Sequence, residues 1–455
     1  MSSTPSPTAP SASITQPAPL TRSRIFVLAI PVIIANAAAP LLGLVDTAII
    51  SHTGEVAAVG AVALASLIFN FMLWGFGFLR MGTSGFVAQA FGANDEAAIK
   101  QHLVRAFSLG LIAGILLIAL QSPLLQFARF AFDASTHVEE QLGEYWNYRM
   151  WSIPAALGSF AISGLLIGLG RYKYLLALQL LLNISNLIFD LVAVIGFEMG
   201  IKGIALGTAM AEWLCFLIGL LMLRKVVPSF FALNIQNILA SLKDKKALTV
   251  FFNTNANIFW RTLLLLISFA IFTNMNAQLG DTHLAATHIL LQFISLSAFF
   301  LDGFAHVAET YVGQALGAKS VSRYRQAVRL TSQCAFLTAS ALAVLLLCFG
   351  SEAISLLTPT PDVQIVASAF LSYAAIYVCV SFAAFQLDGI FIGALETRAM
   401  RNAAIMSTAL FLGLSHWLTN SLGAEGIWLA FIAYVLSRAS ALMLFFKPIE
   451  RKITP

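Results

Sequence analysis

Charged side chains are scarce in this chain. Only 10% of its 455 residues are charged, whereas 59% are hydrophobic. A soluble globular protein carries roughly 25% charged residues, so this composition excludes a surface built for water. The alternating ten-residue segments of an outer-membrane barrel are also absent. Long apolar runs instead recur along nearly the whole chain, each close to the ~20 residues that cross the hydrocarbon core as a helix.

Motifs of several enzyme classes are missing as well. No P-loop of the form GxxxxGK[ST] occurs, so ATP hydrolysis within the chain is not expected, and no HExxH motif occurs. The four cysteines lack CxxC spacing and lie in apolar runs, so we expect small buried hydrophobic side chains there. One short stretch, GTSG at 82–85, matches the GxSG of intramembrane serine proteases. It leaves such a protease, with Ser84 as nucleophile, as a remote alternative to a protein that is not an enzyme.

The apolar runs predict twelve transmembrane helices. Lys and Arg concentrate on the even-numbered connections and on the two tails, and such residues mark cytoplasmic loops. Both termini are therefore expected on the cytoplasmic side. The predicted helices are 24–51, 56–91, 96–121, 136–169, 172–197, 201–226, 246–278, 282–316, 321–349, 362–395, 399–420 and 424–446.

The N-terminal stretch differs from the rest of the chain. It is rich in Ser, Thr, Pro and Ala and has no charge, so it is expected to be disordered and does not follow the plan of a signal peptide. A basic segment in the middle of the chain is expected to be an interfacial linker. We predict a tail at 1–20, a six-helix bundle at 21–226, a cytoplasmic linker at 227–245 and a second six-helix bundle at 246–447.

Two segments of the chain repeat each other. GFVAQAFGA at 85–93 matches TYVGQALGA at 310–318, at an offset of 225 residues, and GIKGIAL at 200–206 matches GAEGIWL at 423–429. Each half then contains six helices and starts on the same side of the membrane. Such parallel repeats are related by an axis along the membrane normal. Two similar bundles with a cleft between them are suited to alternating access.

Polar residues inside the first half are candidates for an ion site. Asp46 lies in an apolar run, and charges at membrane depth are functional by default. Asn186 and Asp190 share one helical face, and Thr208 lies among small residues. Together they predict a site for a proton or a hard cation such as Na⁺, in which the two carboxylates titrate jointly. The alternatives are a helix cap or loop for Asp46, and plain interhelical hydrogen bonds for Asn and Thr.

The second half carries a different polar set. Asp302, His306 and Glu309 form a stripe on one helix, while Arg261 and Asp388 lie on others. We expect Arg261 to form a buried structural pair with one of these carboxylates. Because Asp46 has no acidic counterpart in this half, we place the ion site in the first half.

Two prolines interrupt the first predicted helix. Pro31 and Pro40 each remove a backbone hydrogen bond and permit a bend. The hypothesis is that protonation of Asp46 changes its bonds to the fifth helix and bends the first helix at these prolines. The alternative is a static kink.

These residues carry a family resemblance. The chain resembles the multidrug and toxic compound extrusion (MATE) family in its DinF-like branch, on the stretches LVDTAIISH, GTSGFVAQAFGA, NISNLIFDLVAVIGFEMGIKGIALGTA and LDGIFIGALETRAMRN. The resemblance implies an all-α membrane protein with two six-helix bundles in a V. It also implies a cation site at Asp46, Asn186, Asp190 and Thr208, and bending at Pro31. Asp388 resembles a ligand of other branches, but the seventh helix here offers no carboxylate.

The resemblance implies an antiporter of a bacterial inner membrane. Protons, or sodium ions, would enter as small amphipathic or cationic organic compounds leave, with no resident cofactor and no nucleic-acid partner. We expect a monomer in contact with membrane lipid. A flippase for lipids or lipid-linked precursors stays open, because Arg80, Arg149 and Arg261 could receive a phosphate. Residues proposed for the cargo pocket, with plain packing as the alternative, are Asn70, Phe69, Met72, Tyr148 and Asn183.

Overall fold

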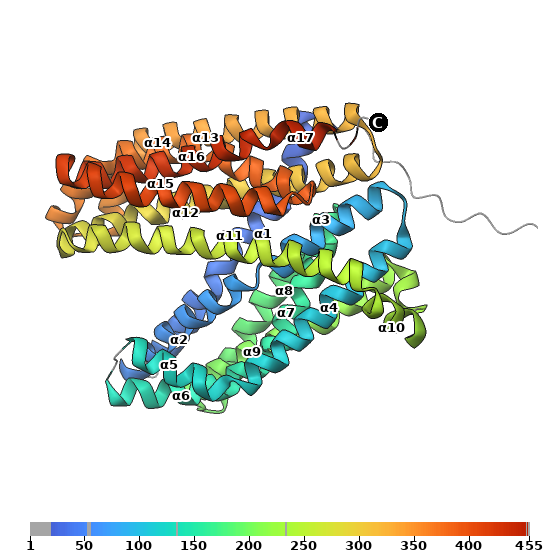
Figure 1. The fold of residues 1–455 in the computed structure, drawn as a ribbon. Helices are drawn as coiled ribbons and strands as arrows, with labels where there is room; N and C mark the ends of the chain where they lie inside the picture. Colours follow the sequence, from blue (N-terminus) through green and yellow to red (C-terminus); the bar gives the residue numbers. More distant parts are fainter. Residues whose placement is uncertain (1–19, 52–55, 133–134, 233, 452, 454–455) are drawn as a thin grey trace, which may run out of the picture.

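A computed structural model describes residues 20–51, 56–132, 135–232, 234–451 and 453 (Figure 1). The predicted tail lies almost wholly outside these residues. Within them the chain is helical throughout and contains no strand. The first half contains α1 (Arg22–Ser51), α2 (Val56–Gly75), α3 (Phe78–Gly92), α4 (Glu96–Ala119), α5 (Gln121–Phe132), α6 (Thr136–Arg149), η1 (Met150–Ser152), α7 (Ile153–Gly168), α8 (Tyr172–Leu191), η2 (Val192–Gly196) and α9 (Gly200–Val226).

The second half follows a short connecting region. That region contains η3 (Pro228–Ala232) and α10 (Ile235–Lys243), and Arg105 Nε donates to the Ser241 carbonyl at 3.2 Å to tie α10 to α4. The remaining helices are α11 (Lys245–Ala277), α12 (Asp281–Gly317), α13 (Val321–Leu357), α14 (Pro361–Gly393), α15 (Thr397–Leu422), α16 (Ala424–Leu444) and α17 (Phe446–Arg451).

The twelve predicted spans are confirmed as helical segments, with two interruptions. The second span breaks at Phe76 and Gly77 into α2 and α3. The fourth breaks at η1, because Pro154 has no N–H to bond the Met150 carbonyl. Eleven segments of the described chain are long and apolar enough to cross a bilayer. The twelfth, α15, is not among them, because Arg, Asn and His side chains interrupt its apolar sequence.

Three sequence expectations need correction. The connection after the third span contains a helix, α5, where we expected a loop, and the ninth helix continues to Leu357 rather than 349. Cys348 is exposed, although Cys215 and Cys334 are buried as expected. The outer face of a transmembrane helix contacts lipid and is also apolar, so an apolar sequence does not show whether a residue faces lipid or the inside of the bundle.

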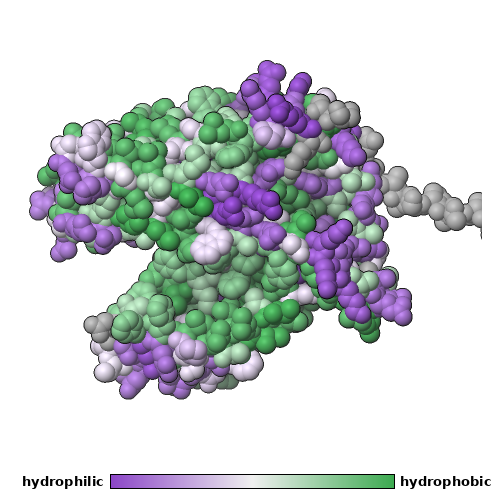
Figure 2. All heavy atoms as spheres, viewed as in Figure 1, coloured by the Kyte–Doolittle hydropathy of each residue, from purple (hydrophilic) through white to green (hydrophobic). Residues whose placement is uncertain are grey.

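The helices form two groups that diverge like a V (Figure 1). Helices α2 to α9 make one arm and α11 to α17 the other. The space-filling view shows a deep cleft between the arms, open at one end and lined mainly by hydrophobic residues (Figure 2). The chain's C-terminus lies at the opposite end, where the arms meet.

Helix α1 belongs to both arms. Its first half packs in the core of the second arm, where Ile25, Ala29 and Val32 share a cluster with Phe304 and residues around it. Its last turns pack in the first arm, where Ile49 and Ile50 belong to a separate cluster. A change in the shape of α1 therefore moves one arm relative to the other.

The repeated segments meet each other where the arms join. Gln89 Nε2 donates to the Gly393 carbonyl at 2.9 Å, and Gln314 Nε2 donates to the Gly168 carbonyl at 3.1 Å. Gln314 is the repeat partner of Gln89, and Gly393 is that of Gly168. The two hydrogen bonds therefore join equivalent residues of the two repeats, as expected for an interface about an approximate two-fold axis.

Glycines make this close approach possible. A Cβ on Gly92 would collide with the Gln314 backbone, and a Cβ on its repeat partner Gly317 would collide with the Gln89 backbone. Only glycine allows two helix backbones to come this close. The repeated QAxGA sequence is therefore the joint of the V.

Candidate functional site

The four predicted ion-site residues lie together inside the first arm. Asp46, near the end of α1, is 2% exposed, and Thr208 on α9 is 1% exposed. Asn186 and Asp190 on α8 are fully buried. The Asp46 carboxyl group interacts with the side chains of the other three. The structure thus places these four side chains in one cluster, which we call the Asp46 cluster.

Local packing explains how the cluster forms. The spacing of Asn186 and Asp190 puts both on the face of α8 that meets α9. Gly207 leaves room there, because a Cβ at this position would collide with the Asp190 carboxylate. Asn186 Nδ2 donates to Thr208 Oγ1 at 3.1 Å, and Thr208 Oγ1 donates to the Ile204 carbonyl at 2.9 Å.

Several acceptor oxygens of the cluster have no donor. Asp46 Oδ1, Asn186 Oδ1 and both Asp190 carboxylate oxygens are buried without a hydrogen-bond partner among the described residues. Buried polar groups are almost always satisfied, and leaving one unpaired is costly. Four unpaired acceptors at one place fit a positively charged species, which is either a proton shared between carboxyls or a hard cation held by oxygen ligands.

The ligand atoms of the Asp46 cluster limit which metal ions could bind there. No group of three or more His, Cys, Asp or Glu side chains suited to a metal occurs in the part of the chain that the structure describes. The Asp46 cluster offers two carboxylates, one amide and one hydroxyl, and no soft or imidazole ligand. Such oxygen ligands suit Na⁺ far better than a transition metal.

A buried ion pair borders the cluster and was missed by the sequence analysis. Arg149 donates to both carboxylate oxygens of Glu212, at 2.7 and 2.6 Å, and also to the Ser152 hydroxyl. The Arg149 guanidinium lies 5.2 Å from the centre of the Phe69 ring. Its charge also acts on Asp46. Glu212 follows Thr208 by one helical turn, so the spacing that selected Asn186 and Asp190 could have found it.

The predicted hinge lies in an unbroken helix. Helix α1 runs through Pro31 and Pro40 without interruption. Asn183 on α8 donates from Nδ2 to the Ala38 carbonyl at 2.7 Å, between the two prolines. This bond ties α8, which carries Asn186 and Asp190, directly to the proline-containing part of α1.

The residues predicted to line a cargo pocket are dispersed. Phe69 is buried, with its ring centre 4.9 Å from that of Trp146, and Met72 packs on the same cluster. Asn70 is exposed on α2, and Asn183 bonds α1 as described above. Tyr148 lines a shallow apolar pocket of about 440 Å³ with Trp151, Met210 and Trp213, among others. These five residues do not form one wall.

The predicted ion pair of the second arm is present. Arg261 pairs with the Asp388 carboxylate, and Arg438 on α16 adds a second contact to it at 3.3 Å. All three side chains are buried. A carboxylate held by two guanidinium groups is already neutralised, which agrees with a structural pair and leaves no vacant acceptor of the kind seen at the Asp46 cluster.

The other polar residues of α12 connect the two arms. Glu309 accepts from the Ser84 hydroxyl on α3 and lies 2.9 Å from His306 Nδ1, and Arg80 Nη1 lies 2.7 Å from His306 Nε2. Asp302 lies one turn before His306 and interacts electrostatically with it. The Ser84 hydroxyl contacts a carboxylate rather than an imidazole. The His that the protease alternative expects as base is therefore not bonded to Ser84.

A family model describes this architecture twice. The MatE model matches residues 31–192 and again 258–417, together more than half of the chain. The two matches confirm the internal duplication read from the sequence. Each match covers most of one arm.

Relatives and solved structures agree with this assignment. DNA damage-inducible protein F of Escherichia coli is 33% identical over 415 residues, covering 91% of this chain and 90% of the relative. Multidrug resistance protein NorM of Vibrio cholerae is 27% identical, covering 93% and 94%.

Among solved structures, the Vibrio cholerae MATE transporter VcmN in its bent form has a TM-score of 0.82 at 18% identity, covering 95% of this chain and 97% of that one. An outward-facing multidrug resistance MATE transporter has a TM-score of 0.85 at 17% identity, with the same coverage. These TM-scores show a shared fold. With the family model and the sequence relatives, they establish that the chain is a multi-pass membrane transporter of the MATE family, in its DinF-like branch.

Proposed function

We propose that this protein is a cation-coupled antiporter that exports small amphipathic or cationic organic compounds. The observation that carries the proposal is the set of unpaired, buried acceptor oxygens at Asp46, Asn186 and Asp190. Relatives named as multidrug resistance proteins support the cargo class. The family consists of transporters rather than enzymes, so the protease alternative is excluded.

We infer that the coupling ion is a proton, with Na⁺ as the alternative. Without a proton, the two adjacent carboxylates repel each other, and Arg149 offers limited relief because Glu212 already pairs with it. A proton on Asp46 turns one acceptor into a donor. The Asp190 and Asn186 oxygens, which have no donor among the described residues, can then accept from it.

This change acts on α1. A new bond between Asp46 and α8 draws the end of α1 toward α8, while the Asn183 bond to the Ala38 carbonyl holds the segment between the prolines. The backbone at Pro31 lacks the usual bond to the Val27 carbonyl and bends more easily. Because the first half of α1 packs in the second arm, this bend changes the angle of the V.

The proposed orientation places both termini in the cytoplasm of a bacterial cell. Hydrophilic residues gather at both ends of the molecule (Figure 2), and the C-terminus lies at the end where the arms meet. Lys and Arg concentrate on the tails and the even-numbered connections, as expected for a cytoplasmic face. The cleft then opens outward, in a state that releases cargo. One unit charge moving inward through 100 mV supplies about 2.3 kcal/mol to this cycle. Both arms come from one chain, so a monomer suffices.

Lipid flipping is less well supported. A flippase needs free cationic groups in its cleft for a phosphate, and the three arginines considered for that role are all engaged. Arg149 pairs with Glu212, Arg261 with Asp388, and Arg80 contacts His306.

Transport in liposomes tests the proposal. Purified protein is reconstituted, and a fluorescent cationic dye is followed while a pH gradient or a sodium gradient is imposed separately. We expect the pH gradient to drive dye movement and Asp46→Asn to abolish it. Dye movement under neither gradient, or unchanged movement in Asp46→Asn, would refute antiport coupled at Asp46.

A further inference from the structure

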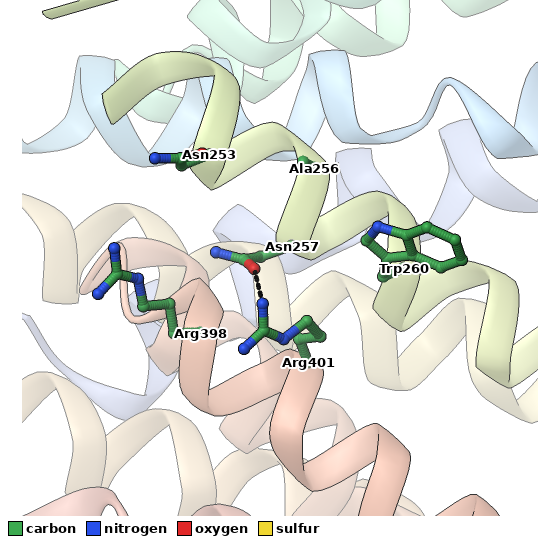
Figure 3. Close-up of a pocket in the computed structure, with 6 residues that line it drawn as sticks. All are labelled: Asn253, Ala256, Asn257, Trp260, Arg398 and Arg401. Carbon is green, nitrogen blue, oxygen red and sulfur yellow. Dashed lines mark hydrogen bonds between the residues drawn. The ribbon is translucent and has the colours of Figure 1, made fainter. Parts of the chain in front are cut away.

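A second polar site lies in the other arm, away from the Asp46 cluster. Figure 3 shows a pocket between α11 and α15, with a volume of about 370 Å³. Both helices contribute side chains that point into it. The residues that line it are Asn253, Ala256, Asn257, Trp260, Arg398 and Arg401.

The pocket carries positive charge without a matching negative charge. Two of its lining residues are arginines, and none is acidic. Arg401 donates only to amide oxygens, from Nη1 to Asn257 Oδ1 at 3.0 Å and from Nε and Nη2 to Asn402 Oδ1 at 3.2 and 3.0 Å. Arg398 is exposed and forms no hydrogen bond with the other five lining residues (Figure 3). Two guanidinium groups therefore converge on one space that no carboxylate lines.

The geometry of the arginines suits an oxyanion. Arg398 and Arg401 are one turn apart on α15, so their side chains leave the helix on the same face, toward α11 (Figure 3). The Asn257 contact holds the Arg401 fork in position. A planar guanidinium fork matches the oxygens of a phosphate and binds them through two parallel bonds.

The surroundings of the pocket are those of a membrane boundary. It lies at the beginning of α15, and the half-exposed Trp260 lines it. The same two helices carry further exposed apolar side chains, which are Phe252, Ile405 and Met406. The space-filling view shows a hydrophilic patch on this arm, surrounded by hydrophobic surface (Figure 2). Trp260 is about half exposed, and tryptophan at such boundaries combines an apolar ring with an N–H donor.

We propose that this pocket binds the phosphate of an anionic phospholipid headgroup. The two arginines hold the phosphate, the Asn253 amide and the Trp260 N–H have donors available for the rest of the headgroup, and the acyl chains lie along the exposed apolar residues of α11 and α15. Basic pockets between transmembrane helices are suited to such headgroups. The apolar border favours a lipid over a soluble phosphate, which would gain nothing from it.

Native mass spectrometry of the purified full-length protein tests this assignment. The protein in detergent is titrated with phosphatidylglycerol and, separately, with phosphatidylcholine of the same acyl chains, which has a phosphate but no net charge. The wild type is expected to retain phosphatidylglycerol preferentially. The variant R398A/R401A is expected to lose that preference, with affinity reduced about tenfold for the loss of charged hydrogen bonds. Equal retention of phosphatidylglycerol by this variant would overturn the proposal.

Two controls keep the result specific. The variant R329A/R451A removes two exposed arginines elsewhere and is expected to retain the lipid as the wild type does. R398A alone removes an exposed side chain that bonds none of the other lining residues, so its loss of lipid is not attributable to a broken bond within the pocket. A third arm adds glycerol phosphate, which has the headgroup chemistry without acyl chains. Displacement of the lipid by equimolar glycerol phosphate would assign the pocket to a soluble phosphate and overturn the lipid assignment.

Discussion

At the scale of single residues, the Asp46 cluster differs from other buried polar groups because several of its oxygens accept no hydrogen bond within the described chain. Ser and Thr hydroxyls elsewhere in the described chain mostly donate to carbonyls of their own helix, and the buried carboxylates Glu212, Glu309 and Asp388 each have partners. Asp46 Oδ1 and both oxygens of Asp190 have none. Acceptors left open in this way are where a mobile cation gains most from binding.

The sequence found most of this cluster but not its neighbour. Asp46, Asn186 and Asp190 were predicted because polar side chains in apolar runs are costly and their spacing places them on one face. Glu212 was missed although it follows Thr208 by one helical turn. Its pairing with Arg149, 63 positions away on another helix, depends on the tertiary fold and could not be predicted from spacing. The position of Arg438 beside Asp388 was missed for the same reason.

The Arg149–Glu212 pair gives a prediction about stability. Glu212→Gln leaves a buried guanidinium without its counter-charge, and loss of one partner of a buried pair costs about 3–5 kcal/mol. We expect a clearly lower unfolding temperature in detergent. The double variant R149M/E212L, which removes both charges, should recover much of the loss. A double variant as unstable as Glu212→Gln would show that the charge imbalance is not the cause.

At the scale of helices, the proposed hinge depends on the prolines of α1, and the two arms meet at the glycines of the joint. Sequence analysis predicted the hinge prolines and found the repeated QAxGA, but it did not predict that the two repeats contact each other. It did not show that α1 packs in both arms, because an amphipathic pattern reports that a face is buried but not which bundle buries it.

Bending of α1 gives a prediction about rate. Pro31→Ala restores a bond to the Val27 carbonyl and stiffens the helix, so dye transport is expected to slow severalfold while dye binding to purified protein is retained. Pro361→Ala is the matched control, because Pro361 lies in the first turn of α14, where a missing N–H breaks no bond. Equal effects of the two substitutions would argue against a hinge at Pro31.

The joint between the arms gives a prediction about conformation. Gly317→Val places a side chain against the Gln89 backbone and is expected to separate the arms at their meeting end. Spin labels at the exposed residues Gln101 and Ser322, measured by double electron–electron resonance, should report longer distances than in the wild type.

Gly413→Val provides the comparison, because a Cβ there meets no atom within 4 Å. It should leave the distance between the two labels unchanged. An unchanged distance in Gly317→Val as well would mean that the repeated segments do not form the joint.

At the scale of the whole molecule, composition and duplication predicted the architecture. The low content of charged residues indicated a membrane protein. The even number of spans and the two parallel repeats predicted two similar arms. Details that depend on local chemistry between spans were not predictable from periodicity. The break before Pro154 and the short helix α5 are examples, because each depends on a few residues between longer apolar runs.

We propose that ion binding at Asp46 changes the angle between the two arms. The unpaired oxygens lie on α1 and α8, and α8 is bonded to α1 between its prolines. The beginning of α1 packs in the opposite arm. Exchange of cargo for a proton follows if the two stabilise different shapes of this one framework.

Proton release on cargo binding tests this claim most directly. Detergent-solubilised protein in weak buffer near neutral pH is mixed with a fluorescent cationic dye, and the change in pH is recorded alongside dye binding. Linkage between the two ligands predicts release of about one proton for each dye bound by the wild type. The exposed-residue control Asp362→Asn should behave identically, and Asp46→Asn should bind dye without releasing a proton. Proton release by Asp46→Asn equal to that of the wild type would contradict the account.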